Sequence, residues 1–119
     1  MGNKLVNMSC GPRPQCDVYI GRRRGTEEHF GNPFSHKGDT LAQIVLPNRG
    51  AAIQAYRDWL AGTAWQDVEP KRRLWVIAHI PELVGKSLGC WCTPLPCHGE
   101  ILSELAELSK FGSDWFDRW

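Results

Sequence analysis

Three of the five cysteines and one of the four histidines of this 119-residue chain lie within one short stretch. Residues 89–100 read Gly-Cys-Trp-Cys-Thr-Pro-Leu-Pro-Cys-His-Gly-Glu. Thiolate and imidazole groups are preferred zinc ligands, and a structural zinc site takes four of them. The four candidate ligands within this Cys/His cluster are Cys90, Cys92, Cys97 and His98. The sequence therefore predicts a bound zinc ion.

Other interpretations of this cluster stay open. Cys10 or Cys16 could replace one zinc ligand, and reduced cysteines also pack as small hydrophobic groups without any metal. An iron–sulfur cluster is a further alternative. In a catalytic interpretation Cys97 precedes a predicted helix, whose N-terminal amides stabilise a thiolate, and His98 and Glu100 are candidate acid–base groups.

The spacing of His98 and Glu100 is shared with the zinc deaminases. In those enzymes a pair of cysteines follows the histidine, whereas here the cysteines precede it. The order of the residues therefore argues against a deaminase.

A second candidate site is a loop rich in arginine and glycine. Arg22, Arg23 and Arg24 follow a predicted strand, at the position where α/β folds place their ligands. Guanidinium groups suit phosphate, and Asn32, in a predicted tight turn, would position the ligand. The alternative is a solvated turn with no ligand. No phosphate-loop or dinucleotide fingerprint is present.

Residues 71–73 form a second basic cluster, Lys-Arg-Arg, at the start of a predicted helix. We expect this cluster to be a solvated face. Together with the first arginine cluster it could form a patch for nucleic acid.

The elements that must position these residues alternate between strands and helices. Short strands are predicted at 4–8, 16–20, 43–46 and 86–91, with the second and last adjacent and parallel. Helices are predicted at 51–60, from 70 to just before Pro81, and at 98–110. Leu74, Ile77 and Ala78 are the expected buried stripe of the middle helix. We therefore predict a small single-domain α/β layered fold with a short, partly parallel sheet and about three helices, stapled by the Cys/His cluster.

Length and composition limit the class of protein. Residues 1–112 suit one domain, and 113–119 form an aromatic tail whose Trp115 and Trp119 could dock a protein partner. Net charge is +1 at pH 7, which excludes a uniformly basic nucleic-acid binder. No signal peptide and no apolar run of about 18 residues are present, so we expect a cytoplasmic protein, without membrane contact, in a bacterial or phage-infected cell. In that compartment cysteines stay reduced.

Several motifs together resemble a known family. They are Asp17-Val18-Tyr19-Ile20-Gly21-Arg22, Gly31-Asn32-Pro33-Phe34, and the stretches 55–60, 83–92 and 96–100. With these motifs the chain resembles the bacterial and phage family catalogued as domain of unknown function 4326. The resemblance implies a compact, stand-alone domain that phages often encode, and it implies no activity. It also implies that Arg22, Asn32, Cys90, Cys92, Cys97 and His98 belong to one site. Members often carry Asp where Glu100 stands.

These observations lead to one functional hypothesis and two alternatives. We expect a zinc-containing protein of phage type that binds or processes a nucleotide or nucleic acid through the arginine–glycine loop. The alternatives are a zinc-stapled interaction domain without catalysis and an enzyme with Cys97 as its nucleophile. The sequence leaves open whether the protein is an enzyme.

Overall fold

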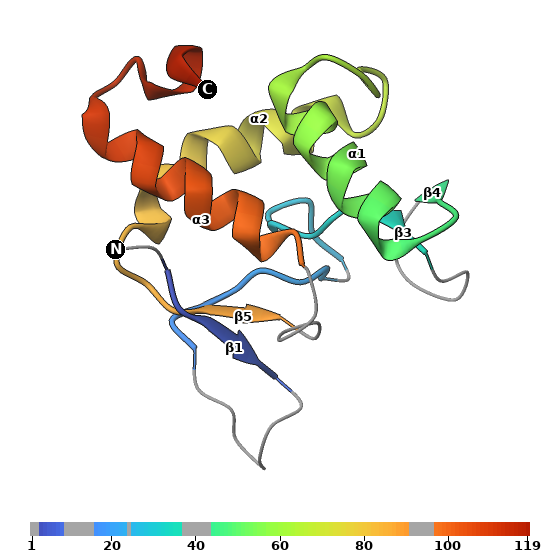
Figure 1. Cartoon of the computed structure of the whole chain (residues 1–119), viewed down its shortest axis with the longest axis horizontal. Helices are drawn as coiled ribbons and strands as arrows, with labels where there is room; N and C mark the ends of the chain where they lie inside the picture. Colours follow the sequence, from blue (N-terminus) through green and yellow to red (C-terminus); the bar gives the residue numbers. More distant parts are fainter. Residues whose placement is uncertain (1–2, 9–15, 24, 37–43, 91–96) are drawn as a thin grey trace.

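The computed structural model describes residues 3–8, 16–23, 25–36, 44–90 and 97–119. Within these ranges the chain forms three α-helices and five short strands, all of them paired in parallel (Figure 1). The predicted class, a small α/β fold, is confirmed.

The main sheet has three strands in the order β1, β5, β2. The strands are β1 (Leu5–Asn7), β2 (Val18–Tyr19) and β5 (Leu88–Cys90). Both neighbours run parallel to β5, so the strand that lies last in the chain is the central one. The predicted parallel pairing of the second and last strands is confirmed. Because the strands are parallel, their carboxyl ends meet at one edge of the sheet.

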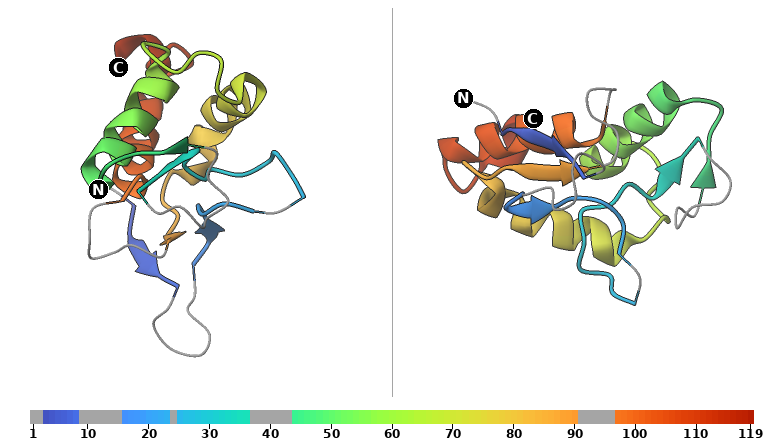
Figure 2. Two further views of the ribbon diagram at one scale, coloured as in Figure 1. Left: turned by 90° about the vertical axis from the view of Figure 1, so that its right-hand side faces the viewer. Right: turned by 90° about the horizontal axis from the view of Figure 1, so that it is seen from below.

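The three helices lie on one side of this sheet, with α3 nearer to β1 and α2 nearer to β2 (Figure 2). They are α1 (Arg49–Ala61), α2 (Pro70–His79) and α3 (Gly99–Leu108). The Asn48 side chain accepts from the Ala51 amide and caps α1, and Gly62 ends it at φ 81°. All three helices agree closely with the predicted ranges.

A second, two-stranded sheet lies beside α1. It pairs β3 (Phe34–Ser35) with β4 (Ile44–Val45). The strand at 43–46 was predicted, whereas β3 was not, because the residues before it carry turn signals. Both residues of β3 are buried, and this strand fixes the end of the arginine–glycine loop against the helix layer.

The predicted buried stripe of α2 is wrong for Leu74 and Ala78, whereas Ile77 is partly buried and packs against the core. Leu74 is 61% exposed and Ala78 is also exposed, whereas Arg72 and Val76 are buried. Arg72 and Val76 are four residues apart and therefore share one helix face. That face turns inward because the Arg72 guanidinium bonds to buried backbone carbonyls, which offsets the cost of burying its charge.

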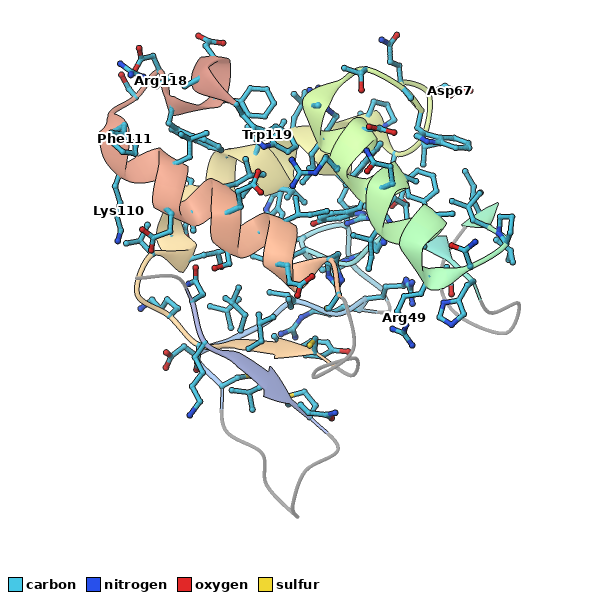
Figure 3. All side chains as sticks on the ribbon, viewed as in Figure 1. Arg49, Asp67, Lys110, Phe111, Arg118 and Trp119 are labelled. Atoms are coloured by element: carbon cyan, nitrogen blue, oxygen red, sulfur yellow. The ribbon has the colours of Figure 1, made fainter. Side chains whose placement is uncertain are left out.

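After α3 the chain continues through two short 3₁₀ turns, η2 (Ser109–Phe111) and η3 (Trp115–Arg118). Trp115 is 7% exposed and belongs to the core. The Trp119 indole donates to Glu104 on α3, and its ring lies 5.4 Å from the guanidinium of Arg57 on α1 (Figure 3). The tail is therefore packed on the domain. None of the helices within the described ranges is both long enough and apolar enough to cross a bilayer.

Candidate functional site

The loop that follows β2 closes back on itself through Arg22. Its Nε donates to the carbonyl of Asn32 at 2.7 Å, and its Nη2 donates to the carbonyl of Phe34 at 3.0 Å. A Cβ at Gly31 would lie 2.7 Å from the Cα of Arg22, so glycine is required for this close approach. The sequence motif Gly31-Asn32-Pro33-Phe34 thus brings the end of the loop against its beginning.

Asn32 is buried and anchors the loop to α1. Its Nδ2 donates to the carbonyl of Ala52 at 3.0 Å, and its Oδ1 accepts from the Phe34 amide at 2.9 Å. The sequence singled this residue out to position a ligand. The structure places it at the pocket described below, where its side chain shapes the loop.

Arg72 reaches the same loop from α2. Its Nη1 donates to the carbonyls of His29 at 3.1 Å and Gly31 at 2.7 Å, and its Nε lies 2.7 Å from Oε1 of Glu69. The Trp59 ring lies 5.0 Å from this guanidinium. The expectation of a solvated face is wrong for Arg72, since the buried carbonyls need a donor and Arg72 provides it.

Arg73 also acts within the fold. Its Nε donates to the carbonyls of Trp59 and Leu60 at 2.8 and 3.1 Å, near the end of α1. The last carbonyls of a helix lack partners within that helix, so Arg73 caps α1. Two of the three residues of the second basic cluster therefore hold the domain together.

These contacts create a pocket beyond the carboxyl end of β2. Its lining residues are Arg22, Arg23, His29, Asn32, Pro33, Glu69 and Arg72. Three guanidinium groups face one carboxylate, so the pocket is positively charged. This is the edge of a parallel sheet at which open α/β folds bind their ligands. Arg24, which the sequence grouped with Arg22 and Arg23, lies outside the described residues.

His29 is neutral in this pocket at physiological pH. Burial, together with the positive charge of Arg72, lowers the pKa of His29 to about 4, and Arg22 and Arg23 act in the same direction. The carboxylate of Glu69 opposes this effect. The Nδ1 of His29 accepts from the Gly31 amide at 3.2 Å, so the ring proton resides on Nε2.

Cys97 and His98 lie at the start of α3, beside the last residue before the arginine–glycine loop. Nε2 of His98 is 2.8 Å from the carbonyl of Ile20, to which it donates, and Nδ1 is 3.6 Å from Sγ of Cys97. That sulfur also accepts from the Gly99 amide at 3.3 Å. Burial lowers the pKa of His98 to about 4.

The structure brings only part of the predicted Cys/His cluster together. Cys97 and His98 are in contact, Cys90 is buried in β5, and Glu100 is exposed on the first turn of α3. Across the ranges that the structure describes, no three His, Cys, Asp or Glu side chains are grouped to hold a metal ion. Cys10 and Cys92 lie outside those ranges. Neither Cys97 nor His98 lines the arginine pocket.

Sequence reasoning missed His29 and Glu69 and expected Arg72 on a solvated face. Glu69 and Arg72 flank Pro70 at a spacing of three, which suits an ion pair at a helix start, and that signal was available. His29 carries no such local signal, because only the closure of the loop by Arg22 and Arg72 brings it into the pocket.

Comparison with known proteins places the chain in a family. The family described as Domain of unknown function (DUF4326) matches residues 5–108. The chain belongs to this family. The DUF4326 match includes every lining residue of the pocket as well as Cys97 and His98, and it ends before η2.

A viral relative of this DUF4326 chain is the "Uncharacterized protein R718" of Acanthamoeba polyphaga mimivirus. The two are 29% identical over 107 residues, which covers 78% of the chain and 68% of the viral protein. No solved structure matches the chain.

Proposed function

We propose that this protein binds a nucleotide through its phosphate in the pocket beyond β2. The observation that carries the proposal is the pocket itself, where Arg22, Arg23 and Arg72 converge at the carboxyl end of a parallel strand. Guanidinium groups pair with phosphate oxygens in charge-assisted hydrogen bonds, which are about twice as strong as neutral ones. The excess of positive charge in the pocket favours a phosphate further.

The three arginines have different parts in this proposal. Arg22 and Arg72 bond to loop carbonyls, so they shape the pocket and add positive charge to it. Arg23 is exposed, with its guanidinium 5.4 Å from the centre of the Tyr19 ring, and it makes no hydrogen bond to the described residues. Arg23 is therefore the arginine whose donors are available to a phosphate.

The distribution of basic residues favours a single nucleotide over a nucleic-acid strand. A strand is held by a row of exposed lysines and arginines along its backbone. Here Arg72 is buried and Arg73 caps α1, so the second basic cluster does not extend the pocket into such a row.

Titration calorimetry with AMP tests this proposal. Because Arg23 supplies charge-assisted hydrogen bonds, we expect Arg23→Ala to weaken AMP binding about tenfold or more, which corresponds to about 1.4 kcal/mol. Arg118→Ala is the matched control, since it also removes one exposed arginine. Arg118 lies in the C-terminal tail and is labelled in Figure 3. We expect the control to bind AMP as the wild type does. Equal affinities of the wild type and Arg23→Ala would contradict the proposal.

We propose, second, that Cys97 and His98 provide two ligands of a zinc ion. In a tetrahedral site with Zn–S of about 2.3 Å and Zn–N of about 2.0 Å, the two ligand atoms lie about 3.5 Å apart. Sγ of Cys97 and Nδ1 of His98 are separated by 3.6 Å. The second nitrogen of His98 bonds to a backbone carbonyl, as is usual for zinc-bound histidines.

The fit to zinc is partial, because Cys90 does not join these two residues in the described arrangement. Metal analysis of the purified protein tests the proposal, with one zinc per chain expected. Cys97→Ser should lower that content, whereas Cys16→Ser should leave it unchanged, since the thiol of Cys16 contacts the sulfur of Met8. Metal-free protein with all thiols open to titration would rule zinc out.

The other two hypotheses have less support. A nucleophilic Cys97 would need access for a substrate, and its side chain is 1% exposed. A protein partner for the tail would find Trp115 already in the core and Trp119 bonded to Glu104. Both stay predictions.

A further inference from the structure

We infer that the pocket takes a ribose phosphate, in which the phosphate lies at the arginines and a sugar hydroxyl donates a hydrogen bond to Glu69. This inference rests on the proposed function and names the part of the nucleotide that the pocket recognises. It is carried by the position, the ion pair and the remaining acceptor capacity of Glu69.

Glu69 is held at the pocket in an unfavourable backbone conformation. Its φ is 38° and its ψ is 57°, a left-handed conformation that non-glycine residues rarely adopt. The ion pair with Arg72 keeps it there: Oε1 lies 2.7 Å from Nε, and Oε2 lies 3.4 Å from Nη2. A carboxylate offers about four acceptor positions, so capacity remains after this pairing. The side chain is partly exposed and lines the pocket.

The charges in the pocket determine which groups of a ligand can bind to the Glu69 carboxylate. A second anionic group would be repelled by the carboxylate. An ammonium group would meet Arg22, Arg23 and Arg72, while the carboxylate already has Arg72 as its partner. A neutral donor such as a hydroxyl is repelled neither by the carboxylate nor by the arginines, and it can occupy the remaining acceptor positions of Glu69.

His29 adds a hydrogen-bond donor to those of the arginines in the pocket. Because its Nδ1 accepts from the Gly31 amide, its Nε2 carries the proton. This N–H makes no hydrogen bond to the residues that the structure describes, so it can donate to an oxygen of the ligand. The pocket therefore combines donors for phosphate oxygens with one acceptor for a hydroxyl. Sugar phosphates carry these two groups within a few bonds of each other.

Calorimetry with three probes tests the inference: inorganic phosphate, 2-deoxyribose 5-phosphate and ribose 5-phosphate. We expect the wild type to bind ribose 5-phosphate about tenfold more tightly than inorganic phosphate, because one added hydrogen bond to a charged group has about that effect. The deoxy sugar shows whether the 2-hydroxyl is the group that is recognised.

Glu69→Gln separates recognition from a structural role. Its amide oxygen still accepts from Nε of Arg72, while the negative charge is removed. We expect it to bind ribose 5-phosphate about tenfold more weakly and inorganic phosphate severalfold more tightly, since the repulsion is gone. Glu107→Gln removes the charge of a partly exposed carboxylate that is paired with Lys110, so it is the control and should change neither affinity.

The outcomes distinguish the inference from the proposed function. Equal affinities for ribose 5-phosphate and inorganic phosphate, or equal weakening of both by Glu69→Gln, would overturn the inference and leave phosphate binding intact. If none of the three probes binds, the proposed function fails with it. If Glu69→Gln does not fold, the order of the three probes on the wild type decides.

Discussion

Arg72 joins the two halves of the pocket. It connects the start of α2 to the carbonyls of His29 and Gly31 in the arginine–glycine loop, and it pairs with Glu69. Removing one partner of a buried ion pair leaves the other uncompensated, which typically costs about 3–5 kcal/mol. We expect this pairing to be the most sensitive single contact of the site.

Arg72→Met should therefore destabilise the protein by about 3 kcal/mol or more, measured by urea unfolding. The neighbouring Lys71 is exposed, so Lys71→Met serves as the control and should change stability by less than about 0.5 kcal/mol. Equal stability of Arg72→Met and wild type would show that the loop does not depend on this guanidinium.

His29 makes the stability depend on pH. Its pKa is lowered from 6.5 to about 4 in the fold, so between these values the unfolded chain binds a proton that the folded protein does not. Stability is thus fully present above about pH 6.5 and decreases as the pH falls toward 4. Burial is the main cause of the lowered pKa of His29; Arg72, Arg22 and Arg23 lower it further, and Glu69 opposes them.

As the pH falls from 6.5 to 4, we expect the free energy of unfolding of His29→Asn to decrease less steeply than that of the wild type. The two slopes should differ by up to about one bound proton. The amide oxygen of the new side chain can still accept from the Gly31 amide. Urea midpoints measured across this range check the difference. Parallel curves for the two proteins would contradict the assignment of a neutral His29.

At the level of elements, the contact between β2 and the end of its loop depends on Gly31. A Cβ there would lie 2.7 Å from the backbone of Arg22, which cannot move without shifting the strand end. We expect Gly31→Ala to cost about 1–3 kcal/mol in urea unfolding and to weaken AMP binding. Gly50→Ala, on the first turn of α1, has room and should be neutral or slightly stabilising. Similar effects of the two variants would argue against the close approach.

The sequence predicts these elements unevenly, for physical reasons. Helices α1 and α3 follow from their apolar periodicity, and the parallel pairing follows from the alternation of strands and helices. The orientation of α2 does not follow from the sequence, because hydrophobicity favours burial of Leu74 whereas the buried carbonyls of the loop require Arg72. The composition of the pocket depends on this orientation. Arg22, Arg23 and Asn32 could be predicted, and the spacing of Glu69 and Arg72 signals an ion pair but not its place in the pocket. His29 carries no local signal in the sequence.

At the scale of the whole molecule, the C-terminal tail closes the domain. Trp115 is buried in the core, whereas Phe111, a few residues earlier, is 68% exposed. We expect Trp115→Ala to destabilise the protein by about 3 kcal/mol or more in thermal or urea unfolding, because a buried aromatic side chain is lost. Phe111→Ala is the control and should have little effect. A small effect of both would show that the tail is detached and free for a partner.

At the scale of the whole molecule, the Cys97–His98 pair lies next to Ile20, the residue that precedes the arginine–glycine loop. Cys97 and His98 hold α3 against the end of β2 and do not line the pocket, whose residues include the arginines and His29. Burial lowers the pKa of His98, and Arg22 and Arg72 of the pocket act in the same direction. The central claim is that the phosphate binds in this pocket.

An NMR titration of the ¹⁵N-labelled protein with AMP tests that claim most directly. We predict the largest amide shifts in the loop from Arg22 to Asn32 and at the start of α2, from Glu69 to Arg72, with a shift of the His29 side chain. Shifts that are absent from these segments, or that centre on the tail or the exposed face of α3, would contradict it.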